Sequence, residues 1–164
     1  MAIERILLLV ALVCVCSGLA SAEEEKYSGP RPPKPDLPYL MHADTLIPTE
    51  AGEAREEHHG KSDAIYIISG AASAARTPLA EPIFVFESDK ISAESLQLFR
   101  LEVKSGNREV VMGKKKSGRP LHVTVKPLGG RLYRIEVNEG LGLETGEYSL
   151  SPESSNSVFC FAVY

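Results

Sequence analysis

The sequence predicts an all-β protein, an immunoglobulin-like antiparallel β-sandwich of about seven or eight short strands. From Ala64 onward, runs rich in β-branched and aromatic residues recur roughly every ten residues. Gly, Pro, Ser and Asn separate these runs and indicate turns between strands. No segment carries the apolar stripe of a long amphipathic helix, so a helical layer is not expected.

The first 22 residues have the pattern of a secretory signal peptide. Arg5 precedes an apolar run over 6–16, and the Ala-Ser-Ala sequence at 20–22 has the small-x-small pattern of a cleavage site. The apolar run is short for a membrane-spanning helix. We therefore expect cleavage after Ala22 and export to the periplasm or the extracellular space, with no membrane span in the mature chain.

Two segments precede the predicted sandwich. Residues 23–38 contain five prolines, and because proline restricts φ and lacks an N–H donor, we expect a Pro-rich disordered linker there. Residues 39–63 are mostly polar and lack an apolar stripe, so we expect a mostly polar loop there with one short strand, at Tyr39–His42 or Thr45–Ile47. The β-sandwich domain is then expected over 64–164.

Within that domain, the apolar runs predict eight strands, at 64–69, 82–88, 96–104, 108–113, 121–126, 131–137, 147–150 and 158–164. In the run 96–104 the alternation changes phase after Leu98, which predicts a β-bulge. The run Val158–Tyr164 is apolar on both faces, so we expect a final strand that is covered on both sides. A transmembrane barrel is disfavoured, because most runs are short for a bilayer and lack aromatic girdles.

Composition and charge exclude several classes of protein. Hydrophobic residues make up 43% and charged residues 24% of the chain, as in ordinary globular proteins. The net charge of -4 argues against a general nucleic-acid binder. After signal cleavage Cys160 is the only cysteine, so no internal disulfide can form, and its apolar strand favours a buried, inert thiol.

The segment "LETGEYSL" resembles the approach to the sixth strand of immunoglobulin-like sandwiches. The resemblance implies that Tyr148 forms a tyrosine corner, its hydroxyl bonding to backbone near Leu141–Leu143. The cysteine and tryptophan of antibody domains are missing, so the resemblance concerns the sandwich architecture; an ordinary turn before a strand is the alternative. The stretches "GAASAARTPLAEPIFVF", "LQLFRLEVKSGNREV" and "GEYSL…VFCFAVY" are similar to small exported bacterial proteins with such a body, a resemblance that implies no activity.

Few residues are candidates for a functional site. Lys114, Lys115, Lys116 and Arg119 form a basic hairpin tip, either a contact for an anionic partner or only a solvated loop. His58 and His59, beside two glutamates, match no metal-ligand spacing, so a solvated acidic loop is favoured. The sequence contains no recognisable catalytic or cofactor motif, so we assign no catalytic residue, cofactor or metal ligand.

These observations favour an exported, non-catalytic binding or assembly module of the cell envelope, with an envelope protein or polymer as its partner. The alternative is an envelope-acting enzyme or enzyme inhibitor whose site is not recognisable from sequence. A deep pocket with converging His, Asp or Glu side chains would favour the enzyme. A flat exposed patch would favour the binding module. The oligomeric state does not follow from the sequence.

Overall fold

The computed structural model describes residues 27–59, 63–113, 118–138 and 140–164. These residues form two antiparallel β-sheets and one short 3₁₀ turn, η1 (Ala93–Ser95), and they contain no α-helix. The all-β prediction is therefore confirmed, with two sheets as a sandwich requires. The immunoglobulin-like character stays a prediction. The predicted signal peptide, 1–22, lies outside the described residues.

The smaller sheet has five strands, and all of its neighbouring pairs are antiparallel. Its order across the sheet is β10 (Val123–Gly129), β11 (Leu132–Val137), β7 (Ile83–Glu87), β1 (Tyr39–His42) and β2 (Thr45–Pro48).

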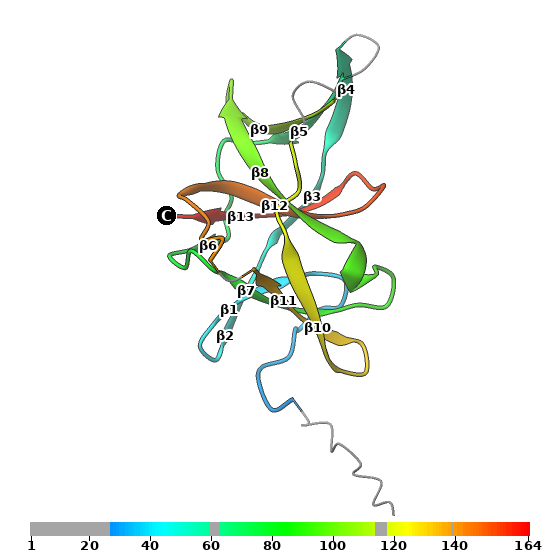
Figure 1. Ribbon diagram of the computed structural model, residues 1–164, viewed down its shortest axis with the longest axis vertical. Helices are drawn as coiled ribbons and strands as arrows, with labels where there is room; N and C mark the ends of the chain where they lie inside the picture. Colours follow the sequence, from blue (N-terminus) through cyan, green and yellow to red (C-terminus); the bar gives the residue numbers. More distant parts are fainter. Residues whose placement is uncertain (1–26, 60–62, 114–117, 139) are drawn as a thin grey trace, which may run out of the picture.

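The larger sheet has eight strands. Seven follow the order β3 (Glu50–Glu53), β13 (Ser157–Val163), β12 (Gly146–Pro152), β8 (Leu96–Lys104), β9 (Asn107–Gly113), β5 (Asp63–Ser69) and β4 (Arg55–His59). The eighth, β6 (Arg76–Thr77), pairs with β13 in parallel. In Figure 1, β12 and β13 cross the middle of the molecule, between the five-stranded sheet on one side and β4, β5 and β9 on the other.

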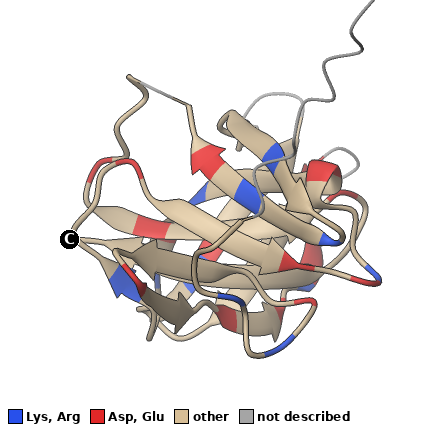
Figure 2. Ribbon diagram, turned by 90° about the horizontal axis from the view of Figure 1, so that it is seen from below, with Lys and Arg blue, Asp and Glu red and all other residues tan. Residues whose placement is uncertain are grey.

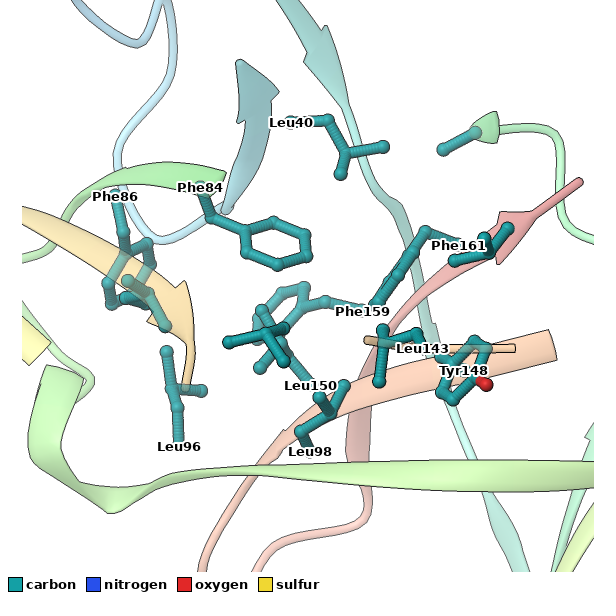
Figure 3. Packing of buried hydrophobic residues seen from close by; sticks show 14 of the residues in the cluster. Leu40, Phe84, Phe86, Leu96, Leu98, Leu143, Tyr148, Leu150, Phe159 and Phe161 are labelled. Atoms are coloured by element: carbon teal, nitrogen blue, oxygen red, sulfur yellow. The ribbon is translucent and has the colours of Figure 1, made fainter. Parts of the chain in front are cut away.

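The main hydrophobic core fills the space between the two sheets (Figure 3). Phe84 of β7 meets Phe161 of β13 edge to face, with ring centroids 5.0 Å apart. Phe161 also stacks on Tyr148 of β12, with ring centroids 5.6 Å apart. Aromatic pairs of this kind contribute about 0.5–1.5 kcal/mol beyond the area that they bury. The contact between Phe84 and Phe161 therefore packs the two sheets face to face, and Tyr148 supports the Phe161 ring from within the larger sheet.

The other face of the larger sheet carries a second apolar cluster. Its buried members are Ala54, Ile68, Leu101, Val158 and Cys160. Because successive side chains of a strand point to opposite faces, Val158 and Cys160 reach this cluster while Phe159 and Phe161 reach the main core. The prediction that the final strand is covered on both sides is confirmed.

The same two-sided burial corrects the interpretation of 96–104. Leu98 of β8 lies in the main core, and Leu101 lies in the second cluster. The register of β8 against β12 runs without a shift from Leu96 to Leu101, so the predicted β-bulge is wrong. The change of phase in the sequence reflects a regular strand that is buried on both faces at different points.

The four strands β1 to β4 lie where the sequence predicted a mostly polar loop with one short strand over 39–63, and β1 and β2 occupy the two places considered for that strand. β3 and β4 are the two ends of the order of the larger sheet, and most of their side chains are exposed. Edge strands of this kind are held by backbone hydrogen bonds and need no apolar alternation, so pattern analysis does not detect them. The expected domain start at residue 64 therefore falls inside the folded unit. The remaining strands, β5 and β7–β13, correspond to the eight predicted ones.

The described part of the Pro-rich segment contacts the sheets. Pro32 and Pro38 are buried. The Asp36 carboxylate accepts hydrogen bonds from the Ser88 hydroxyl and from the backbone amides of Asp89 and Lys90. This differs from the free linker expected over 23–38, because a carboxylate near the turn after β7 satisfies backbone donors that the turn leaves open.

Tyr148 makes the kind of hydrogen bond that the tyrosine-corner interpretation requires. Its side chain is 1% exposed, and its hydroxyl donates to the backbone carbonyl of Glu144 at 2.8 Å. The acceptor lies one residue beyond the expected Leu141–Leu143. The bond ties the loop before β12 to the ring that packs in the main core.

We predict that Tyr148→Phe costs about 0.5–1.5 kcal/mol, because it removes one hydrogen bond and keeps the ring. Tyr148→Ala should cost roughly 3–5 kcal/mol, because it also leaves a cavity against Phe161. Tyr164→Phe, at a tyrosine that is 58% exposed, is the matched control and should leave stability nearly unchanged. Denaturant unfolding measures all three free energies, and equal costs for the two Tyr148 variants would contradict the assigned role of the ring.

Candidate functional site

The larger sheet curls back on itself. β3 and β4 are separated in the chain only by Ala54, yet β3 hydrogen-bonds to β13 and β4 hydrogen-bonds to β5. The two ends of the sheet order therefore meet at Ala54. A pocket of about 280 Å³ lies inside this curl, between the β4–β5–β9 side and the β8–β12–β13 side.

The floor of the pocket is apolar. It is formed by side chains of β4, β5, β8, β9 and β13 and by the junction residue between β3 and β4: Ala54, Tyr66, Ile68, Phe99, Val110, Met112 and Val158. Phe99 is on the face of β8 opposite Leu98, so the two-sided pattern of β8 places it here. Ligand pockets are commonly lined in this way, with a few polar groups to orient the bound molecule.

The polar part of the lining comes mainly from β12 and the loop that follows it; Ser149 is buried, while Ser151 and the exposed loop form the rim. Ser149 and Ser151 lie on the same face of β12 with their hydroxyl oxygens 3.1 Å apart. The loop over 152–156 completes this side. It is anchored where the Ala54 amide donates to the Asn156 carbonyl at 2.8 Å.

A glutamate and a tyrosine face each other across the β4–β5 side of the pocket. Glu56 and Tyr66 are directly opposed in the register, so the Glu56 carboxylate lies beside the Tyr66 side chain. Burial, with the negative charge and hydrogen bond of Glu56, raises the pKa of Tyr66, so the hydroxyl stays a donor. Glu56 has a further neighbour in His58, whose Nε2 atom lies 3.2 Å from Glu56 Oε1.

A buried arginine holds the curl together from outside the pocket. The Arg108 side chain of β9 is 1% exposed. Its guanidinium donates to Glu50 Oε1 of β3 at 2.6 Å, to the Ser73 hydroxyl at 2.6 Å, and to two backbone carbonyls, those of Ser69 and Gly70, at 2.9 Å each. All three guanidinium nitrogens therefore have partners, as a buried charge requires.

Two carboxylates complete this arginine cluster. Glu147 of β12 accepts from both the amide and the hydroxyl of Ser73, and lies 3.8 Å from the Arg108 guanidinium. Glu50 also accepts from the Ala74 amide at 2.9 Å. Burial alone would raise the pKa of Glu50, but its hydrogen bonds and the Arg108 charge outweigh this effect and lower its pKa.

The residues singled out from the sequence mostly lie away from the pocket. Lys114–Lys116 are outside the described residues, and Arg119 is exposed. His58 and His59 are in β4, and in the described part of the chain no three His, Cys, Asp or Glu side chains are grouped to hold a metal ion. Cys160 is fully buried, and burial raises the pKa of its thiol to about 12, which favours an inert role.

Sequence reasoning missed both the pocket and the arginine cluster. The signal for the pocket was present, because a strand with apolar residues on both faces must be covered twice, as 96–104 and 158–164 are. The arginine cluster left no comparable signal, since Glu50, Ser73, Arg108 and Glu147 are far apart in the sequence and lie in no motif.

Comparisons of the chain with protein-family models, with curated proteins and with solved structures each found no match. The resemblance to exported immunoglobulin-like proteins therefore stays a prediction. Among the described residues, no helix is long and apolar enough to cross a bilayer. The charged residues of both signs are interspersed over the strands and loops seen in Figure 2.

We predict that Arg108→Met destabilises the protein by about 3–5 kcal/mol, because it leaves Glu50 and Glu147 without their buried cation. The control is Arg100→Met, which removes an exposed pair with Glu144 and should change stability far less. Denaturant unfolding measures both. If the two variants unfold at the same midpoint, Arg108 does not hold the curl.

Proposed function

We propose that this chain is an exported, non-catalytic binding module that takes a small, mostly apolar ligand into the pocket of the curled sheet. The observation that carries the proposal is the lining of the pocket, an apolar floor under a rim of serine, amide and carboxylate groups. Such a lining excludes water from an apolar body and orients a polar head group.

The pocket fits neither of the simple sites considered from the sequence. It is a concave site, unlike a flat patch, and the described residues that line it include two carboxylates, those of Glu56 and Glu153, and no histidine. His58 is not among these lining residues, and its Nε2 atom lies 3.2 Å from Glu56 Oε1.

The size of the pocket bounds the ligand. A cavity of roughly 150 Å³ is enough to hold benzene. The pocket, at about 280 Å³, therefore fits one aromatic ring with a short chain and a head group. We use 2-phenylethanol as the neutral probe of this size.

The proposal predicts saturable binding of 2-phenylethanol, with amide chemical shifts changing at the floor residues Ile68, Phe99 and Val110 of isotopically labelled protein. Ser151→Phe should abolish these changes, because a ring at the rim fills the pocket. Thr45→Phe, on the exposed edge of the other sheet, should leave them intact. Absence of saturable binding, or binding that survives Ser151→Phe, would refute the pocket as the binding site.

Export rests on the signal-peptide pattern and stays part of the proposal. The intact mass of the chain isolated from whole cells that express it should give an N-terminus at Glu23. A chain that keeps residues 1–22 would count against export. Docking to an anionic envelope partner through Lys114, Lys115, Lys116 and Arg119 is a separate prediction from the sequence.

A further inference from the structure

The described rim of the pocket is rich in hydrogen-bond acceptors and carries negative charge. Glu56 lies on the β4 side and Glu153 on the loop after β12, and no lysine or arginine is among the described residues that line the pocket. The Glu56 side chain is 33% exposed, so it lies at the boundary between the floor and solvent. A ligand head group entering here meets carboxylates first.

The nearest buried cation does not offset this charge. Arg108 lies outside the pocket lining and gives its hydrogen bonds to Glu50, Ser73 and two backbone carbonyls. Glu50 and Glu147 together balance its charge. An anionic ligand would therefore enter a pocket with no free positive partner among its described residues.

The floor favours a cation as well. Tyr66 and Phe99 contribute aromatic surface, and ring faces attract ammonium groups, more strongly where water is excluded. The Nε2 atom of His58 lies 3.2 Å from Glu56 Oε1. A carboxylate has about four lone-pair sites, so the other sites of Glu56 can accept from a ligand.

We propose that the pocket binds a small amine, with its ammonium group at Glu56 and its apolar body against Ile68, Phe99 and Val158. The inference rests on the proposed binding function and names the ligand class for the same pocket. Glu153, on the loop after β12, adds a second negative group to the described lining.

The test compares three probes that share one ring and differ in head group: 2-phenylethylamine, 2-phenylethanol and phenylacetate. Dissociation constants are measured by amide shift titration at about pH 8, where histidine side chains are ordinarily neutral. We expect the amine to bind at least about tenfold more tightly than phenylacetate, because the carboxylates of the lining attract an ammonium group and repel a carboxylate. The neutral alcohol should fall between them.

The matched variants are Glu56→Gln and Glu57→Gln. Both remove one negative charge from β4, but Glu57 points to the opposite face of the strand, where it pairs with Arg55. Glu56→Gln should weaken amine binding by about tenfold and leave the alcohol unchanged. Glu57→Gln should alter neither.

The outcomes distinguish a wrong ligand class from a wrong binding function. If phenylacetate binds as tightly as the amine, the ligand class is wrong while the pocket still binds. If Glu57→Gln weakens the amine as much as Glu56→Gln does, the preference comes from net charge and the placement at Glu56 is wrong. If none of the three probes saturates, the proposed function and the ligand class both fail.

Discussion

The structure depends on a buried cation that reaches across strands far apart in the sheet order. Arg108 belongs to β9, yet its guanidinium contacts Glu50 on β3 and the 69–73 segment, which in turn contacts Glu147 on β12. A fully buried guanidinium is costly to desolvate, so it persists only where every donor has a partner. That condition requires β9 to lie near β3 and β12, and it is met only if the sheet curls.

The curl accounts for the rest of the architecture. Strands β8, β12 and β13 have the five-stranded sheet over one face and the β4–β5–β9 side over the other. Both faces must then be apolar where large side chains meet. Where the β4–β5–β9 side faces β12, the side chains of Ala54, Ser149 and Ser151 are small. They therefore do not fill the space between the two sides of the curl. The pocket is the volume that these small residues leave open.

The contrast between strands that bury their side chains and strands that expose them explains how much of the structure could be predicted from the sequence. Apolar alternation identified eight strands, the two-sided final strand among them. It gave no clear strand at β1, although Leu40 of β1 is fully buried in the main core. It failed for β3 and β4, which lie at the ends of the sheet order and expose most of their side chains. It failed also for the candidate site, because Arg108 and Glu50 meet only through tertiary structure and Glu56 looked like part of a solvated loop. The hydrogen bond from Tyr148 to the preceding loop could be anticipated because its donor and acceptor are close in the sequence.

If the arginine cluster holds the curl, the cluster should open only when the core unfolds. The most direct measurement is native-state hydrogen exchange at the Ser73 and Ala74 amides, which lie in a loop and donate to Glu147 and Glu50. If the cluster holds the curl, both amides exchange as slowly as the central amides of β12, through global unfolding. Exchange near the rate of an unprotected loop would show that the cluster opens independently and that the curl is held by apolar packing alone.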